Sequence, residues 1–222
     1  MLQLILFDLD GTLVDTAPDL GLALNMQRER HGLPPLLPET IRPYASHGSR
    51  GLLSVGFGLH PDDPSFMQMR EEYLGLYDEV FTRSPVMFPG IAELLSALED
   101  RNLCWGVVTN KPGRFTKPLL EAIGLDKRAS CVVSGDDAAR PKPYPDTLLL
   151  AMKQANTKPE YCLYVGDAER DIQAARAAGI TSVIALYGYL DETDRPEEWG
   201  ADATVNFPMD VLKLIPTDCV SR

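Results

Sequence analysis

Two aspartates near the start of the chain have the residue type and spacing for catalysis at a metal ion. Asp8 and Asp10 directly follow residues 4–7, an apolar run typical of a buried strand. With one residue between them, both carboxylates can project from the same side of the chain, and Gly11 and Thr12 then begin a turn. Two acids at the end of a central strand are costly unless positive charge lies between them, and Mg²⁺ prefers oxygen ligands. The pattern predicts a magnesium site, with a solvated turn as the plainer alternative.

Three further polar segments accompany later apolar runs. Thr109 and Asn110 end one such run, where a hydroxyl and free backbone amides can hold phosphate oxygens. Lys142 stands between two prolines, which stiffen the backbone that presents its ammonium group. Asp167 ends another apolar run, and Asp171 follows one helical turn later. Taken singly, a helix cap, a solvated lysine and an acidic helix start explain these residues equally well.

The elements that must position these residues differ between two parts of the chain. Residues 14–85 have an all-helical pattern, with helices expected over 17–31, 38–58 and 64–83. After that block, strands alternate with helices. The strands are expected at 104–109, 131–134, 162–165, 182–186 and 203–205, and the helices at 91–101, 115–123, 146–156 and 172–178.

This alternation predicts an α/β fold with a parallel sheet covered by helices on both faces. In such folds, ligands bind beyond the carboxyl ends of the strands. Asp8, Thr109 and Asp167 each stand where a predicted strand ends. We therefore expect them to meet at one edge of the sheet.

Composition narrows the class of protein. The chain has 222 residues, enough for one large domain or a domain with a smaller insertion. It contains 32 acidic and 21 basic residues, a formal net charge of −11. Nucleic acids and anionic membranes require a basic surface, so neither is an expected partner. An anionic substrate would have to be attracted by local positive groups and a metal.

The cysteines and the first residues favour a reduced, cytoplasmic protein. Cys104, Cys131, Cys162 and Cys219 are widely spaced and form no C-x-x-C pair. Three of them lie in strand-like runs, where cysteine usually behaves as a small core residue. The first apolar run breaks at Asp8, so we expect neither a signal peptide nor a membrane-spanning segment.

Taken in order, the motifs resemble those of the haloacid dehalogenase-like phosphohydrolases. An apolar strand precedes D-x-D-G-T, a second precedes T-N, an isolated lysine follows, and a third strand precedes G-D-x-x-x-D. The resemblance covers essentially the whole chain. It implies a Rossmann-like core of residues 1–13 and 86–222, with a helical cap of residues 14–85 that determines substrate specificity. It also implies a Mg²⁺-dependent phosphatase that acts on a small phosphoester as a monomer or homodimer.

The resemblance implies a catalytic role for each motif residue. Asp8 matches the nucleophile that becomes a transient aspartyl phosphate. Asp10 matches the general acid and base. Thr109, with the amide of Asn110, matches the group that holds the phosphoryl oxygens, and Lys142 matches the cation that offsets their charge.

The resemblance also implies the metal ligands. These are the Asp8 carboxylate, the Asp10 backbone carbonyl and Asp167, with Asp171 in support through water or Lys142. Dehalogenases of this group do not keep an acid–base aspartate at the position of Asp10, so the resemblance favours phosphoryl transfer.

Within the superfamily, the chain is most similar to the phosphoglycolate phosphatases. That similarity rests on residues 7–16, 107–112, 187–189 and 200–202. The N-acetylmuramic acid 6-phosphate phosphatases are similar over the same stretches, and residues 105–115 fit that branch as well. A phosphomutase of the beta-phosphoglucomutase kind and an inactive binding protein with this fold are further alternatives.

Substrate choice is expected to depend on the cap. Residues 46–51 form a glycine-flanked segment in which Arg50 could bind a carboxylate or a second phosphate through two hydrogen bonds. An arginine at a helix start that faces water is the alternative, and His47 is similarly undecided. This segment departs from the asparagine-containing pattern of many phosphoglycolate phosphatases. Residues 12–19 and 86–90 bracket the cap and are candidate hinges.

Overall fold

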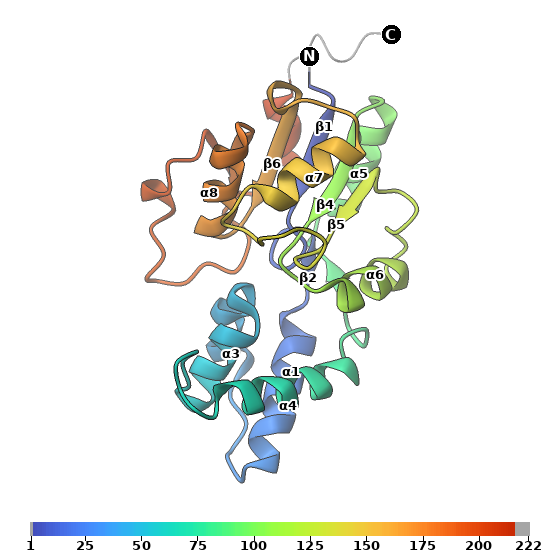
Figure 1. Ribbon diagram of the computed structural model, residues 1–222. Coiled ribbons are helices and arrows are strands. Elements are labelled where there is room, and N and C mark those ends of the chain that lie inside the picture. Colours follow the sequence, from blue (N-terminus) through green and yellow to red (C-terminus); the bar gives the residue numbers. More distant parts are fainter. Residues whose placement is uncertain (1, 216–222) are drawn as a thin grey trace.

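A six-stranded sheet in which all neighbouring strands are parallel forms the centre of the larger part of the molecule (Figure 1). The computed structural model describes residues 2–215. The strand order is β5-β4-β1-β6-β7-β8, so the first strand lies in the middle of the sheet. The strands are β1 (Leu4–Phe7), β4 (Cys104–Val108), β5 (Cys131–Val133), β6 (Cys162–Gly166), β7 (Thr181–Ala185) and β8 (Ala203–Val205). The predicted α/β class is confirmed.

Helices cover both faces of this sheet, as the alternation along β1 requires. Leu4 and Leu6 pack among side chains of two helices on one face, α7 (Asp146–Gln154) and α8 (Glu169–Ala178). Ile5 and Phe7 belong to the core on the other face. That face is covered by α5 (Ile91–Asp100), α6 (Gly113–Ala122) and the 3-10 turn η4 (Pro208–Leu214). Two further 3-10 turns are η2 (Pro159–Tyr161) and η3 (Pro196–Glu198).

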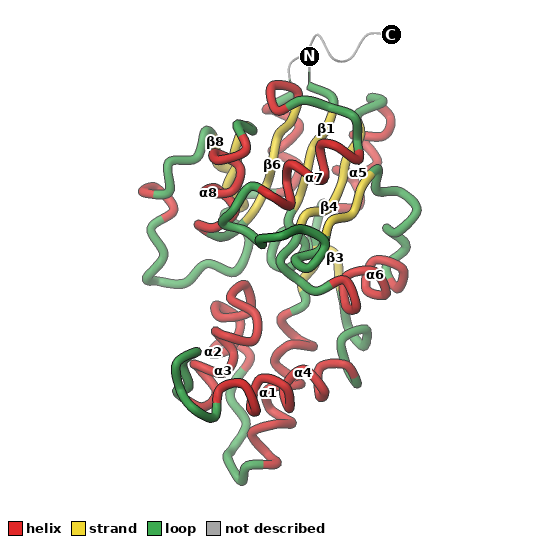
Figure 2. The backbone as a smooth tube through the Cα atoms, viewed as in Figure 1, coloured by secondary structure: helices red, strands yellow, loops and turns green. Residues whose placement is uncertain are grey.

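Four helices between β1 and the rest of the sheet form a separate layer, which we call the helical insertion. They are α1 (Ala17–Arg30), α2 (Pro38–Ile41), α3 (Gly48–Phe57) and α4 (Phe66–Asp78). Leu24 of α1 and Leu52, Leu53 and Tyr73 of the later helices are almost fully buried in its interior. Figure 2 shows these helices together below the sheet, at the end where β1 stops.

The single helix expected over residues 38–58 is wrong, because the structure divides that segment into three pieces. Between α2 and α3 lies the 3-10 turn η1 (Arg42–His47). Pro43 has no backbone N–H to donate to a preceding turn of α-helix. Gly48 has φ +57°, a left-handed conformation that interrupts a continuous helix. Ser46 and His47 therefore lie at the end of η1, directly before α3 begins.

The two connections into and out of the helical insertion pair with each other as a short antiparallel ribbon. Its strands are β2 (Val14–Asp15) and β3 (Val86–Met87), with Val14 opposite Met87. The sequence predicted only hinge-like turns at these positions. Strands of two residues are too short to produce a recognisable alternation.

The cysteine prediction is confirmed in part. Cys131 and Cys162 are buried free thiols, whereas Cys104, the first residue of β4, is exposed. Cys219 lies outside the described residues. Within residues 2–215, no helix combines the length and the apolar character needed to cross a bilayer.

Candidate active site

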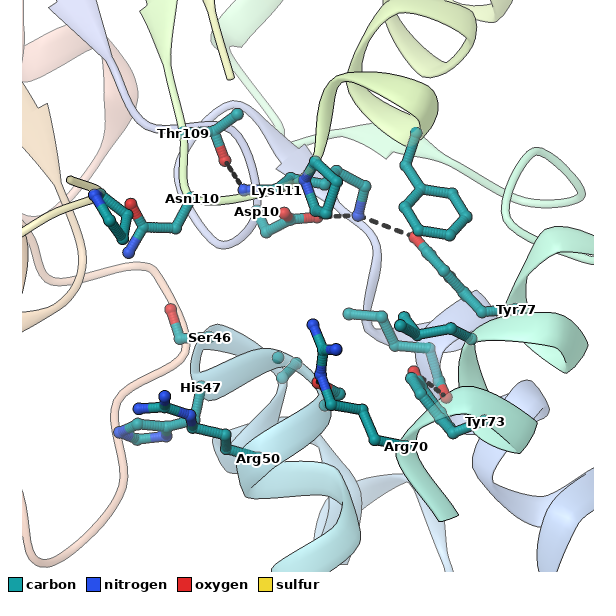
Figure 3. A pocket seen from close by; sticks show the side chains of 18 of the residues that line it. Asp10, Ser46, His47, Arg50, Arg70, Tyr73, Tyr77, Thr109, Asn110 and Lys111 are labelled. Carbon is teal, nitrogen blue, oxygen red and sulfur yellow. Dashed lines mark hydrogen bonds and ion pairs between the residues drawn. The ribbon is translucent and has the colours of Figure 1, made fainter. Parts of the chain in front are cut away.

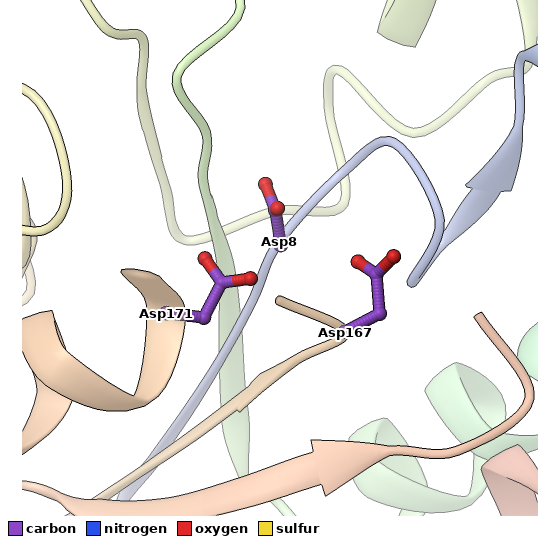
Figure 4. A group of neighbouring side chains, drawn as sticks. All are labelled: Asp8, Asp167 and Asp171. Atoms are coloured by element: carbon purple, nitrogen blue, oxygen red, sulfur yellow. The ribbon is translucent and has the colours of Figure 1, made fainter. Parts of the chain in front are cut away.

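Three buried aspartates meet at the carboxyl end of the sheet. Asp8 follows β1 and Asp167 follows β6, two adjacent strands in which Phe7 pairs with Val165. Asp171 lies in the first turn of α8. Each residue is at most 2% exposed, and the three offer carboxylate oxygens within 4.8 Å of one another (Figure 4). Parallel strand order therefore brings together acids that are far apart in the sequence.

Lys142 supplies positive charge to this cluster from a fully buried side chain. Its Nζ atom lies 2.9 Å from Asp8 Oδ1 and 2.7 Å from Asp171 Oδ1. One ammonium group therefore bridges two of the three carboxylates. In the described residues, Asp167 forms no ion pair.

Burial and the neighbouring charges shift the pKa values of the three carboxyl groups in different directions. Burial, together with the nearby Asp8 and Asp171 charges, raises the pKa of Asp167 to about 7. Burial also raises the pKa of Asp8, despite the opposing effect of Lys142. Burial acts in the same direction on Asp171, but Lys142 and Arg170 outweigh it and lower the pKa of that carboxyl. Without a further cation, the cluster carries an excess of negative charge.

Hydrogen bonds and close backbone approach fix the Asp167 carboxylate. Its Oδ1 accepts a hydrogen bond from Thr12 Oγ1 at 3.0 Å, and its Oδ2 accepts one from the backbone N–H of Tyr189 at 3.0 Å. Gly11 has φ +85°, and a Cβ atom there would collide with the carboxylate. A Cβ atom at Gly188 would collide with the Asp167 side chain as well. Neither glycine can be replaced without displacing the acid.

Thr109 and Asn110 lie at the end of β4, the other neighbour of β1. Thr109 is buried, and its Oγ1 accepts a hydrogen bond from the Lys111 backbone N–H at 3.1 Å. The Asn110 side chain donates to the Lys142 carbonyl at 2.8 Å and accepts from the Lys142 N–H at 2.9 Å. The sequence indicated only the Asn110 backbone amide, so this support of the lysine segment was missed.

Asp10 has its own basic partner, which the sequence analysis also missed. Its Oδ1 accepts hydrogen bonds from Thr16 Oγ1 at 2.5 Å and from Lys111 Nζ at 3.0 Å. Lys111 also donates to Tyr77 Oη on α4 at 2.8 Å. Lys111 directly follows Thr109 and Asn110 in the sequence, and this position at a strand end could have indicated a role in the site.

A cavity of about 700 Å³ separates this end of the sheet from the helical insertion (Figure 3). One wall carries the predicted residues Asp8, Asp10, Thr109, Asn110 and Lys142. The opposite wall is formed mainly by α3, α4 and the end of η1, and it includes Arg50, Arg70 and Tyr73. The predicted core residues and Arg50 therefore share one cavity. Asp167 opens instead on a smaller neighbouring cavity of about 260 Å³.

The helical insertion touches the sheet at both ends of the cavity. At one end, Tyr77 contacts Lys111 as described and packs against Phe115, with ring centroids 5.0 Å apart. At the other end, Ser46 Oγ donates to Asp167 Oδ2 at 2.9 Å, and Arg170 donates to the Ser46 carbonyl at 2.7 Å. The cavity is thus bounded by contacts between the two layers.

Residues 5–185 match the sequence profile of a family described as haloacid dehalogenase-like hydrolase. The chain belongs to the haloacid dehalogenase-like hydrolases. This match confirms the resemblance seen in the motifs. The buried acidic site and the similarity to named phosphatases identify this family member as a phosphatase of a small phosphoester.

Individual members of the family are similar over nearly the whole chain. N-acetylmuramic acid 6-phosphate phosphatase of Pseudomonas aeruginosa is 41% identical, with 98% of each chain covered. Phosphoglycolate phosphatase of Xanthomonas campestris is 40% identical, with 92% of each chain covered. The crystal structure of a predicted phosphoglycolate phosphatase from Haemophilus somnus superposes with a TM-score of 0.82 at 28% identity, covering 96% of this chain and 97% of the other.

The acidic cluster of this haloacid dehalogenase-like hydrolase fits a divalent metal ion. Three buried carboxylates share one lysine, so the donor set is rich in oxygen and short of positive charge. Hard divalent cations prefer such ligands. Burial, together with the Asp8 and Asp171 charges, raises the pKa of Asp167, and a bound cation would oppose that shift.

Proposed function

We propose that the protein hydrolyses N-acetylmuramic acid 6-phosphate. The similarity to the Pseudomonas aeruginosa phosphatase, which extends over 98% of both chains, carries this proposal. The cavity of about 700 Å³ supports it, because that volume is typical of sites for ligands much larger than a two-carbon acid phosphate. Phosphoglycolate phosphatase, the first choice from the sequence, is the second candidate, favoured by 40% identity to the Xanthomonas campestris enzyme.

We infer a double displacement in which Asp8 and Asp10 divide the chemistry. A carboxylate oxygen of Asp8 attacks phosphorus while the bond between phosphorus and the sugar oxygen breaks. Asp10 donates a proton to that leaving oxygen. Water then attacks the aspartyl phosphate, the bond to Asp8 breaks, and Asp10 accepts the proton of the water. Both aspartates line the same wall of the cavity, which supports this assignment.

The remaining residues position groups and balance charge in this mechanism. Thr109 and the Asn110 amide hold phosphoryl oxygens, and Lys142 offsets negative charge beside Asp8. Asp8, the Asp10 carbonyl and Asp167 would hold Mg²⁺, with Asp171 in support through Lys142. The ion would neutralise charge on the transferring phosphoryl group. Since phosphoryl transfer depends mostly on positioning and electrostatics, a site of this composition suffices.

Two further expectations from the sequence become part of the proposal. The catalytic core comprises residues 1–13 and 86–222, and residues 14–85 act as a cap that selects substrate. The β2–β3 ribbon at the junction supports this division. The buried thiols of Cys131 and Cys162, free among the described residues, support a reducing, cytoplasmic location.

A panel of phosphoesters tests the function directly. Phosphate release with MgCl₂ is measured for N-acetylmuramic acid 6-phosphate, 2-phosphoglycolate, glucose 6-phosphate and p-nitrophenyl phosphate, with Asp8→Asn as the inactive control. We expect the highest kcat/KM for N-acetylmuramic acid 6-phosphate and no release by the control. Preference for 2-phosphoglycolate would establish the second candidate. Conversion of a hexose phosphate to its isomer, dependent on a sugar bisphosphate, would establish a mutase.

A further inference from the structure

Arg70 extends from α4 toward the middle of the cavity, in the direction of Asp10 and Lys111 (Figure 3). Its Nε donates a hydrogen bond to Ser49 Oγ on α3 at 3.2 Å, which fixes the stem of the guanidinium group. Within residues 2–215, its two terminal nitrogens have neither a hydrogen-bond acceptor nor an acidic partner. The Arg70 side chain is only partly exposed, so these N–H donors face the cavity without an acceptor from the protein.

The lysines of the cavity are already committed to acids of the protein. Lys111 forms an ion pair with Asp10. Lys142 forms ion pairs with Asp8 and Asp171. Arg50, the residue favoured by the sequence, is exposed and lies beside His47 at one side of the cavity (Figure 3). The third arginine that lines the cavity, Arg170, donates to the Ser46 carbonyl. Arg70 is therefore better placed than Arg50 to meet a substrate held at the phosphate-binding residues.

The open part of the Arg70 guanidinium group suits a planar anion. Two parallel N–H donors match the two oxygens of a carboxylate, a geometry that arginine favours. The phosphate-binding residues Thr109 and Lys142 lie on the opposite wall, so Arg70 faces a different part of the substrate. Both candidate substrates carry one carboxylate besides the phosphate.

We propose that Arg70, oriented by Ser49, forms the subsite for the substrate's carboxylate. This assignment rests on the proposed function and makes Arg70 a specificity-determining residue. A phosphoester without a carboxylate leaves the guanidinium group unpaired in the cavity, which disfavours the transition state of that phosphoester relative to that of the acid.

Two pairs of substrates isolate the contribution of the carboxylate. N-acetylmuramic acid 6-phosphate is compared with N-acetylglucosamine 6-phosphate, which lacks only the lactyl acid. 2-Phosphoglycolate is compared with 2-hydroxyethyl phosphate, in which an alcohol replaces the acid. The ratio of kcat/KM within each pair is measured for the wild type, Arg70→Met, Arg70→Lys and Arg50→Met. Arg30→Met, an exposed arginine at the end of α1, is the matched control.

We expect Arg70→Met to lower kcat/KM for the preferred acid about 10- to 100-fold. For the substrate of each pair that lacks the acid, kcat/KM should change less than about 3-fold, within the range of ordinary surface substitutions. Arg70→Lys should retain part of the preference, and Arg30→Met all of it. Methionine and arginine have similar helix propensity, so α4 should tolerate the substitution. A melting curve of each variant checks that the protein remains folded.

Three results would overturn this assignment. They are an equal loss of activity on both members of a pair, loss of the preference in Arg50→Met but not in Arg70→Met, and a wild type that discriminates within neither pair. Failure of the proposed function would give a different result. If the acid preference depends on Arg70 only in the 2-phosphoglycolate pair, the subsite stands and the sugar substrate is rejected.

Discussion

Lys111 Nζ lies 3.0 Å from Asp10 Oδ1, with the lysine side chain only 5% exposed and the aspartate side chain 17% exposed. The same ammonium group donates to Tyr77 Oη on α4. The proposed acid–base residue is therefore held by a cation that also contacts the helical insertion. Because this pair is largely removed from solvent, loss of the lysine leaves a carboxylate without its partner.

Replacing Lys111 by methionine should lower kcat about 10- to 100-fold. This factor corresponds to the usual free energy of a hydrogen bond to a charged group. The reason is that Asp10 loses the donor that orients its carboxylate. Steady-state phosphate release measures the effect, and Lys117→Met on the exposed face of α6 is the matched control. An unchanged kcat in Lys111→Met would show that Thr16 alone is sufficient to orient Asp10.

Asn110→Ala should weaken catalysis through Lys142. The alanine variant loses both hydrogen bonds between the Asn110 side chain and the Lys142 backbone. We expect kcat to fall roughly 10-fold and the free energy of unfolding to fall by about 1–3 kcal/mol, since buried polar groups lose their partners. Kinetics and urea denaturation measure the two effects, with the exposed Asn206→Ala as control. Wild-type values of both quantities would contradict this role.

Asp10→Asn should reduce kcat about 10²- to 10⁴-fold, because an amide can neither protonate the leaving oxygen nor accept a proton from water. The variant keeps the shape of the side chain but leaves the Lys111 ammonium group without its carboxylate, so its melting temperature should fall, and the rate is measured at a temperature at which the variant is folded. A phosphatase assay with N-acetylmuramic acid 6-phosphate checks the rate. A variant within a few fold of the wild type would exclude Asp10 as the acid–base group.

The buried Asp167 predicts how the metal-free protein responds to pH. Its pKa is raised to about 7 in the folded state, whereas an unfolded aspartate has a pKa of about 3.9. Between these values the folded protein holds a proton that the unfolded chain has released. The contribution of this carboxyl to the free energy of unfolding is therefore complete below about pH 4 and is lost as the pH rises through about 7.

Thermal unfolding in EDTA and in MgCl₂ at pH 6 and pH 8 measures this response. We expect the metal-free protein to melt at a lower temperature at pH 8, and MgCl₂ to raise the melting temperature more at pH 8 than at pH 6. Mg²⁺ binds the ionised carboxylate, so protons compete with it at the lower pH. Asp167→Asn should lose most of the difference between the two pH values. A magnesium effect that is equal at both pH values would contradict this account.

The strand ends could be predicted from the sequence because their signal is local. Short apolar runs mark the strands, and the parallel order brings their last residues to one edge. For this reason the amino-acid pattern alone assigns Asp8, Thr109 and Asp167 to one edge of the sheet. The same reasoning predicts the helical character of residues 14–85, in which the structure has helices between Ala17 and Asp78, but not the break at Pro43 and Gly48.

The contacts between the layers could not be predicted, because they depend on how the helical insertion is oriented over the sheet. The approach of Tyr77 to Lys111 and that of Ser46 to Asp167 join residues from separate layers. The choice between Arg50 and Arg70 has the same basis. Both arginines lie on helices that line the cavity, and only the packing of α3 against α4 shows which one extends toward Asp10 and Lys111.

The most direct test of the proposed chemistry is to trap the phosphoryl group on the protein. The wild type and Asp8→Asn are mixed with N-acetylmuramic acid 6-phosphate and MgCl₂, quenched in acid within one turnover, digested and examined by mass spectrometry. We predict a phosphoryl group on the wild-type peptide that contains Asp8, and no modification or phosphate release with Asp8→Asn. A phosphoryl group on another residue, or continued release of phosphate by Asp8→Asn, would contradict the mechanism.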